Sequence, residues 1–459
     1  MLGPTRQVAR GFTAGVLLGA LVGCGGADRD GTPGSRPDDS DTWVARHDSG
    51  APAPDAAGGV VLSPAGDRVF VTGASATIAY DAVTGDELWQ VPGEFPASGG
   101  SPPPPVIAVS PDGAAVFVAG RARVLAYAAE DGRPLWTAPF GPTVGRGAEA
   151  HVVAVAPDGS AVYVHGSGKV DGGDTDLVTA SYDPVDGSLR WAAASGAVRG
   201  RPDYLWLSGS RSLAVAPAGD AVYVAGTAQA RGSRTDYLTV ALRARDGRRI
   251  WARRYDGPAG RDDIGGAVAV TADGARVVSV GSSVGRGGQA DVTTVAYDAR
   301  SGHQAWVSTY DGPDHANDVA TLVAAAPDDD VVFVAGSSER PTTGRRDYLV
   351  LAYAVGTGER RWVRFHDGGG EGQRDDEAGA LAVSPGGDAL YVTGWSVDAV
   401  AGSAVATVAY APSGRLLWDA SYDDAVRGGE RALEIAASDE RVVVNATSDG
   451  DMATVAYPD

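Results

Sequence analysis

Cysteine, lysine and asparagine are nearly missing from this chain. Its 459 residues include 1 cysteine, Cys24, so no disulfide can form within the chain, although exported proteins often use them. Lys169 is the single lysine, and Asn317 and Asn445 are the only asparagines. Acidic residues outnumber basic ones, 58 to 38, and the formal net charge is -20. This charge disfavours binding to nucleic acid phosphates or anionic lipid headgroups, so we expect no nucleic-acid partner.

The N-terminus carries an export signal. Arg6 and Arg10 precede an apolar stretch at residues 11–22, which is too short to span a bilayer and is typical of a signal-peptide core. The stretch ends in Leu-Val-Gly-Cys24, which resembles the lipobox of bacterial lipoproteins. The resemblance implies cleavage before Cys24 and a diacylglycerol on its sulfur. The alternative is an incidental cysteine in an ordinary signal peptide.

These features divide the chain into three parts. Residues 1–23 are predicted to be a lipoprotein signal peptide, residues 24–41 a flexible tether with almost no apolar side chains, and residues 42–459 a single folded domain. Acyl chains on Cys24 would hold the protein at a bilayer, at about 0.8 kcal/mol per buried CH₂. We therefore expect an exported protein, lipid-anchored to the outer face of the cell membrane or to the outer membrane.

A motif that ends in tryptophan recurs along the folded part. Each copy runs from an apolar strand with a Pro-Asp-Gly or related turn, through a Val-Tyr-Val-x-Gly strand and an Ala-Tyr-Asp strand, to Gly-x-x-x-Trp. A period of roughly 50 residues with several short strands per unit is typical of β-propeller blades. The repeat tryptophans are Trp43, Trp89, Trp136, Trp191, Trp251, Trp306, Trp362 and Trp418.

The two ends of the folded part predict how the ring closes. The last repeat, residues 432–457, has three strand patterns and no fourth, whereas residues 43–48 offer a fourth strand alone. The latter segment is similar in type and order to residues 362–367. We therefore predict an all-β, eight-bladed β-propeller of four-stranded blades, in which the N-terminal strand completes the last blade. Closure removes the exposed sheet edges that favour aggregation.

The tryptophan motif also carries a family resemblance. Residues 79–89, with Ala79, Asp81, Thr84, Gly85 and Trp89, are similar to the tryptophan-docking motif of the PQQ-like quinoprotein propeller family. The resemblance covers about residues 42–459. It implies that the eight repeat tryptophans have a structural role and dock between neighbouring blades.

Some members of that family are PQQ-dependent dehydrogenases, which resemble one another in a vicinal cysteine disulfide, a calcium site of Glu, Asn and Asp, and a catalytic Asp. A chain with Cys24 alone cannot form the disulfide. The 6 histidines follow no metal-ligand spacing. A Gly-x-Ser-x-Gly match around Ser283 leads into no predicted helix, as a nucleophile elbow would. We therefore expect no catalytic residues and no organic cofactor.

Carboxylates between each outer strand and the next inner strand are the main chemical feature of the repeats. These loops lie on one face of a propeller, so their oxygens could converge on a hard cation such as Ca²⁺, which takes six to eight oxygen ligands. The alternative is that aspartate makes turns and that arginines such as Arg261 balance the charge. The candidate ligands are Asp256, Asp263, Asp311, Asp318, Asp367 and Asp376.

Two functions follow as hypotheses. The first is a membrane-anchored extracytoplasmic propeller that acts as a non-catalytic binding or scaffold module for a protein or glycan partner. The second is an extracytoplasmic enzyme, either a divergent quinoprotein or a polysaccharide-active propeller. A cluster of carboxylates, histidines or tyrosines around the central channel would favour the second, and the loop at residues 195–210, with Tyr204 and Trp206, is a candidate for sugar stacking.

Overall fold

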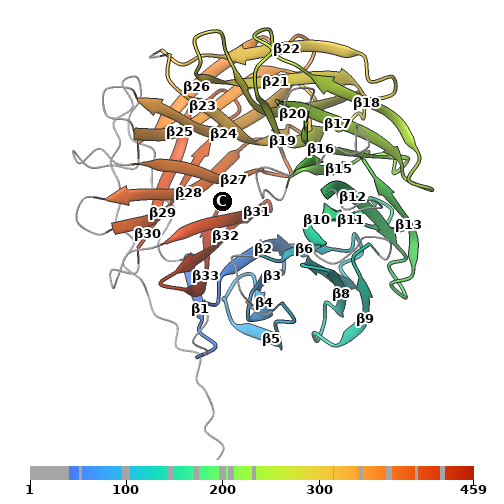
Figure 1. Ribbon diagram of the computed structural model, residues 1–459. Coiled ribbons are helices and arrows are strands. Elements are labelled where there is room, and N and C mark those ends of the chain that lie inside the picture. The colour runs from blue at the N-terminus through green and yellow to red at the C-terminus, as the bar shows by residue number, and fades with distance from the viewer. Residues whose placement is uncertain are drawn as a thin grey trace, which may run out of the picture.

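The repeats fold into eight antiparallel sheets arranged as blades around a central axis in the computed structural model (Figure 1). The predicted signal peptide, Cys24, the tether up to residue 40 and Trp206 lie outside the part of the chain that the structure describes. Within that part, no helix is long and apolar enough to cross a membrane. The described residues are 41–50, 54–95, 104–141, 148–169, 175–195, 203–204, 211–229, 234–313, 315–340, 345–367, 375–398, 402–423 and 430–459.

Each blade is an antiparallel meander whose first strand is innermost. Hairpin glycines with positive φ, such as Gly113 at 70°, allow the tight turns that follow the inner strands. Blades 1 to 4 consist of β2 (Ala57–Leu62), β3 (Arg68–Gly73), β4 (Ala76–Asp81) and β5 (Glu87–Pro92); β6 (Val106–Val109), β7 (Ala115–Gly120), β8 (Arg123–Ala128) and β9 (Pro134–Pro139); β10 (Glu149–Val155), β11 (Val162–Lys169), β12 (Thr175–Tyr182) and β13 (Leu189–Ala194); and β14 (Asp203–Tyr204), β15 (Leu213–Val215), β16 (Ala221–Gln229), β17 (Thr235–Arg243) and β18 (Arg249–Tyr255).

The second half of the chain repeats this order with longer strands. Blades 5 to 8 consist of β19 (Asp263–Val270), β20 (Arg276–Val284), β21 (Ala290–Asp298) and β22 (Gln304–Tyr310); β23 (Asp318–Ala325), β24 (Val331–Arg340), β25 (Arg345–Ala354) and β26 (Arg360–His366); β27 (Asp376–Val383), β28 (Leu390–Asp398), β29 (Gly402–Tyr410) and β30 (Leu416–Tyr422); and β31 (Arg431–Ala437), β32 (Arg441–Ser448) and β33 (Asp451–Pro458), with β1 (Trp43–His47) as the outer strand of blade 8.

The predicted closure of the ring is confirmed. Strand β1 pairs antiparallel with β33, from Trp43 opposite Ala456 to His47 opposite Met452. In Figure 1 the blue N-terminal strand lies beside the red C-terminal strands of the same sheet. The first and last described strands therefore hold each other in place.

Blade 4 departs from the predicted four strands. Asp203 and Tyr204 form the short strand β14, which pairs with Ala228 and Thr227 of β16. Strand β15 pairs with residues 222–224 on the same edge of β16. The inner strand of this blade is therefore split in two. The sequence pattern placed Asp203 and Tyr204 within a long loop at residues 195–210, so β14 was not expected.

The repeat tryptophans lie at the seams between blades. Indole Nε1 of Trp251 in blade 4 donates a hydrogen bond of 2.8 Å to the carbonyl oxygen of Ala299 in blade 5. Trp306 makes the same bond to Val355, also at 2.8 Å. Equivalent bonds to the next blade are made by Trp43, Trp89, Trp136, Trp191 and Trp362.

The glycine of the Gly-x-x-x-Trp motif explains why the motif recurs. Gly302 has a φ of 67°, and a Cβ built on it would lie 2.6 Å from Cδ2 of Trp251 in the preceding blade. Gly358 stands in the same relation to Trp306, at 2.5 Å. Glycine is required twice over, because other residues disfavour this φ and because any Cβ would strike the indole.

Candidate functional site

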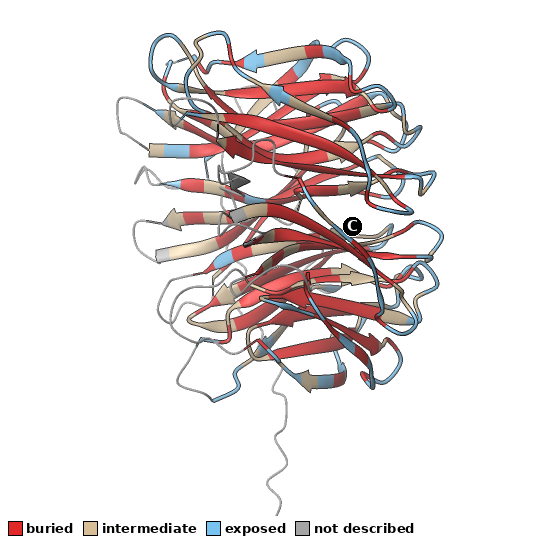
Figure 2. Cartoon of the chain, turned by 45° about the vertical axis from the view of Figure 1, so that its right-hand side comes forward, coloured by how far each residue is buried: buried red, intermediate tan, exposed pale blue. Residues whose placement is uncertain are grey.

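The meander places the chain connections on two opposite faces of the ring. Turns after the first and third strand of each blade lie on one face, which we call the hairpin-turn face. Connections after the second and fourth strand lie on the other, which we call the loop face. Figure 2 shows buried residues along the strands and exposed residues at the strand ends and connections. Any site that draws on several blades must therefore lie on one of these faces or on the axis.

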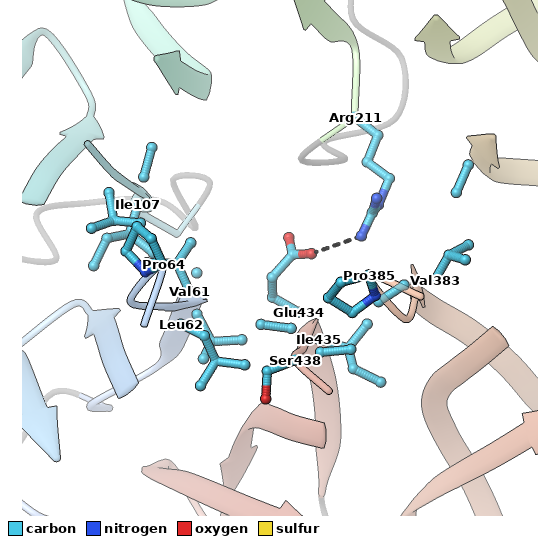
Figure 3. Close-up of a pocket in the computed structure, with 18 of the residues that line it drawn as sticks. Val61, Leu62, Pro64, Ile107, Arg211, Val383, Pro385, Glu434, Ile435 and Ser438 are labelled. Carbon is cyan, nitrogen blue, oxygen red and sulfur yellow. Dashed lines mark hydrogen bonds and ion pairs between the residues drawn. The ribbon is translucent and has the colours of Figure 1, made fainter. Parts of the chain in front are cut away.

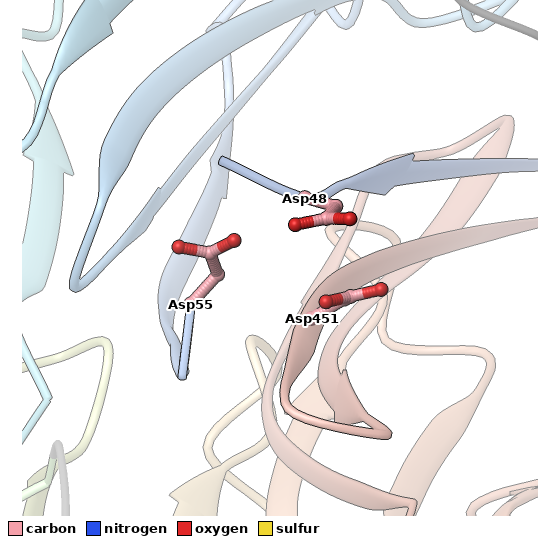
Figure 4. A group of neighbouring side chains, drawn as sticks. All are labelled: Asp48, Asp55 and Asp451. Atoms are coloured by element: carbon pink, nitrogen blue, oxygen red, sulfur yellow. The ribbon is translucent and has the colours of Figure 1, made fainter. Parts of the chain in front are cut away.

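On the loop face, the structure brings the predicted aspartates together in pairs and adds a third to each pair. In every group, one carboxylate oxygen from each residue lies within 4.8 Å of the others. A fourth group lies where the ring closes (Figure 4). We call these groups the acidic triads: Asp236, Asp256 and Asp263; Asp291, Asp311 and Asp318; Asp347, Asp367 and Asp376; and Asp48, Asp55 and Asp451.

Each acidic triad spans a seam between two blades. Its members come from the start of a third strand, from the residue that follows the fourth strand, and from the start of the next inner strand, as with Asp236, Asp256 and Asp263. The first of these positions was not predicted from the sequence. The signal for it was an aspartate that opens the third strand in Thr-Asp-Tyr and Arg-Asp-Tyr, at Asp236 and Asp347.

Two of the triad aspartates also fasten the loop that carries them. The backbone N–H of Gly257 donates to Asp263 at 2.7 Å, and that of Gly312 donates to Asp318 at 2.5 Å. The hydroxyl of Ser283 also donates to Asp263. The serine of the Gly-x-Ser-x-Gly match is thus a hydrogen-bond partner within β20. These contacts fit the turn-making interpretation of the acidic loops.

The triads concentrate negative charge. Burial, together with the charges of Asp311 and Asp318, raises the pKa of Asp291 to about 6. Burial also raises the pKa of Asp263 and Asp347 above its usual value. Each triad has a basic neighbour, and three carboxylates beside one such group leave negative charge that a divalent ion would neutralise. The neighbours are Arg254 at 3.6 Å from Asp236, His315 at 2.7 Å from Asp311, Arg46 at 3.1 Å from Asp451, and Arg340 beside Asp347.

The ring axis holds a cavity of about 950 Å³, which we call the axial chamber. Inner strands of all eight blades line it, and its walls are mainly valine, leucine, isoleucine and alanine. The charged residues in its lining are Arg211, Glu434 and, in one turn at its opening, Asp439 and Glu440. This is the size and composition of a typical ligand pocket.

One ion pair crosses the axis. Arg211 precedes β15 in blade 4 and Glu434 belongs to β31 in blade 8, on the opposite side of the ring, and their side chains meet at 3.4 Å (Figure 3). In the register of the inner strands, Glu434 stands where blade 7 has Ala380. Neither residue could be predicted from the sequence, because only the closed ring brings blades 4 and 8 face to face.

A smaller cavity of about 310 Å³ opens on the loop face and shares Glu434 with the axial chamber. His151, Glu377, Trp395 and Arg431 line it. Each has a partner: His151 Nε2 lies 3.3 Å from the Ser167 hydroxyl, the Arg431 guanidinium lies 5.0 Å from the Trp395 ring centre, and Glu377 lies 3.4 Å from Arg346. Burial lowers the pKa of His151 to about 4, so the ring is neutral near pH 7.

Fold and repeat together define a PQQ-like β-propeller, which confirms the predicted family resemblance. The model of the family described as outer membrane protein assembly factor BamB matches residues 34–233 and 174–418. Because these matches cover most of the chain, the protein belongs to this family. A search of curated proteins finds no match.

Solved structures agree on the fold. The WD40 domain of Sif2 is 11% identical with a TM-score of 0.58, covering 89% of this chain and 97% of that one. A quinohemoprotein alcohol dehydrogenase from Pseudomonas putida HK5 is 13% identical with a TM-score of 0.55, covering 91% and 75%. BamB from Moraxella catarrhalis is 17% identical with a TM-score of 0.47, covering 90% and 98%. The two likenesses with TM-scores of 0.55 and 0.58 establish the propeller fold and nothing about chemistry.

Proposed function

We propose that this protein is an exported, membrane-anchored propeller that acts as a non-catalytic scaffold for a partner in the cell envelope. Membership of a family described as an outer membrane assembly factor is the observation that carries the proposal. The ring supports it, because a rigid closed propeller presents two broad faces without exposed sheet edges. Anchoring through a lipid on Cys24, at the outer face of the cell membrane or at the outer membrane, is part of the proposal.

Two measurements test this function separately. Cross-linking followed by affinity capture from solubilised membranes should recover the same partner in replicate preparations, and capture of no reproducible partner would argue against a scaffold. Cys24→Ala should release the protein from the membrane fraction. Retention of that variant in membranes would refute the lipid anchor and leave the scaffold role untouched.

We also propose that the acidic triads bind Ca²⁺. The support is that each triad gathers three carboxylates at a blade seam, where a cation would join neighbouring blades. Calorimetric titration with Ca²⁺ should give heat, and the melting temperature should rise. Asp263→Asn should reduce both effects, whereas Asp220→Asn, an exposed residue on the hairpin-turn face, should not. Absence of heat and of a thermal shift would end the metal proposal and leave the turn-making role.

The alternative function is an extracytoplasmic enzyme, favoured by the gathering of His151, Glu377 and Trp395 at the loop-face cavity. A quinone fits these residues poorly. Both nearby arginines, Arg431 and Arg346, are already engaged with Trp395 and Glu377. Incubation with PQQ, Ca²⁺ and a primary alcohol should give no dye reduction above a protein-free control. Reduction that disappears in Glu377→Gln would instead favour the enzyme.

A further inference from the structure

The opening of the axial chamber on the hairpin-turn face is bordered by the turns that follow the inner strands. At several seams the turn of one blade packs on the turn of its neighbour: a methyl group at Gly113 of blade 2 would lie 3.4 Å from Cδ of Pro64 in blade 1. A methyl group at Gly387 of blade 7 would likewise lie 3.1 Å from Cδ of Pro327 in blade 6. The turns that follow the eight inner strands together form the rim of the chamber, and at these seams neighbouring turns support each other.

This rim is acidic all the way round. Each of the eight turns contributes at least one exposed carboxylate, and none of the turn residues is lysine or arginine. Hydroxyl groups of Ser110 and Thr271 hold the pKa of Asp112 and Asp273 below its usual value, so these carboxylates are ionised at neutral pH. The acidic rim consists of Asp67, Asp112, Asp158, Asp220, Asp273, Asp328, Asp330, Asp388, Asp439 and Glu440.

Inside the rim the chamber is apolar and roomy because of one sequence position. In six of the eight blades the inner strand carries an alanine that lies three residues before the turn to the second strand and lines the chamber. These alanines are Ala108, Ala214, Ala269, Ala324, Ala382 and Ala436. The next residue is branched and partly exposed in several blades, as in Leu62, Val109 and Val270. Small side chains leave space on the axis, and the branched ones give that space an apolar wall.

The far end of the chamber adds no net charge. Arg211 and Glu434 pair with each other there, at the point where the chamber meets the loop-face cavity. The charge that a ligand meets on entry is therefore mainly that of the acidic rim, in which Asp330 is paired with Arg361 at 2.6 Å. Anionic ligands are repelled, and a neutral apolar ligand gains nothing from the rim.

We propose that the axial chamber, with its acidic rim, is the docking site for a basic segment of a protein partner. Apolar side chains of that segment enter the chamber, and lysines or arginines on either side of them pair with rim carboxylates. Charge complementarity selects the basic segment, and burial of its apolar side chains holds it. This inference rests on the proposed scaffold function and names the face and the chemistry of the partner.

The test uses the full-length protein in phosphatidylcholine nanodiscs and three labelled heptapeptides. The first peptide has three leucines between Lys-Arg and Arg-Lys; the second replaces its basic residues by glutamate, and the third replaces its leucines by serine. Fluorescence anisotropy should detect binding of the first peptide, with the other two at least tenfold weaker. Affinity for the first peptide should fall as salt rises, because the exposed rim charges are screened.

Two variants with matched controls locate the binding site. Asp220→Asn with Asp439→Asn and Glu440→Gln neutralises part of the rim; Glu94→Gln with Glu149→Gln and Asp262→Asn makes the same change in charge away from it. Ala269→Phe fills the chamber, whereas Ala305→Phe adds the same ring on an exposed outer strand. The rim and chamber variants should each weaken binding at least tenfold, and their controls less than twofold. If Ala269→Phe alters the melting transition, Ala324→Leu replaces it.

Equal effects of a variant and its control, equal binding of the basic and acidic peptides, or no binding of the first peptide would each overturn the inference. Its failure is distinguishable from failure of the scaffold function. A partner captured from membranes that is indifferent to the rim and chamber variants would refute this docking site and leave the scaffold standing. Rim-dependent peptide binding without any captured partner would support the docking site and argue against the scaffold function.

Discussion

Replacing one seam glycine by alanine should loosen the ring in a way that can be calculated. Gly302 has a φ of 67°, which costs an L-residue roughly 1–2 kcal/mol. Its new methyl group would also lie 2.6 Å from Cδ2 and 2.8 Å from Cγ of Trp251. Relieving that overlap costs about 1–3 kcal/mol. We therefore expect Gly302→Ala to lower the free energy of unfolding by about 2–5 kcal/mol.

Gly219 provides the matched control. Its φ is 70°, and nothing lies within 4 Å of a Cβ built on it. Gly219→Ala should therefore show only the backbone cost, roughly 1–2 kcal/mol. The difference between the two variants isolates the contact between glycine and tryptophan, which the sequence motif alone could not reveal.

Urea unfolding followed by tryptophan fluorescence and circular dichroism measures both variants. The midpoint for Gly302→Ala should fall clearly below that for Gly219→Ala, and the slopes should match. The Trp251 environment should also change, since its 2.8 Å bond to Ala299 depends on the same seam. Equal midpoints for the two variants would refute the docking of glycine against tryptophan as a source of stability.

Three further predictions follow from particular contacts. Deleting residues 42–48 removes β1 and leaves β33 as an open edge, so the melting temperature should drop for the whole ring, and an unchanged transition would count against closure. The folded-state pKa of Asp291, about 6, exceeds the value of 3.8 for a free side chain, so stability should decline as pH rises from 4 to 6. In EDTA, Asp291→Asn should flatten that decline and raise the free energy of unfolding at pH 7 by about 1 kcal/mol, after allowance for solvent screening. Identical pH profiles of stability for the variant and the parent would contradict this. Ser283→Ala removes a donor to buried Asp263 and should lower the unfolding free energy by about 1–3 kcal/mol, a result that equal urea midpoints would exclude.

Much of the fold was predictable because the repeats are local and similar. The spacing of the tryptophans predicted eight blades, and the orphan strand pattern at residues 43–48 predicted the closure that pairs β1 with β33. The split inner strand of blade 4 was not predictable from the pattern. Asp203 and Tyr204 carry no strand periodicity of their own, and only pairing with β16 makes them a strand.

The candidate sites were predictable in part. Asp256 and Asp263 are close in sequence, so the loop that joins their strands was enough to group them. Asp236 joins them from the start of another strand, and the register of β17 against β18 decides that contact.

By itself, the sequence determined the class of the protein: repeated strands, turn glycines and seam tryptophans act within one blade or between neighbours, where short-range chemistry is sufficient. What lies on the axis was decided only by the tertiary structure. The Arg211–Glu434 pair, the alanine-lined chamber and the acidic rim draw on blades far apart in the chain. Their side chains share one space because closing the ring brings all eight inner strands around the same axis, and no local pattern encodes that convergence.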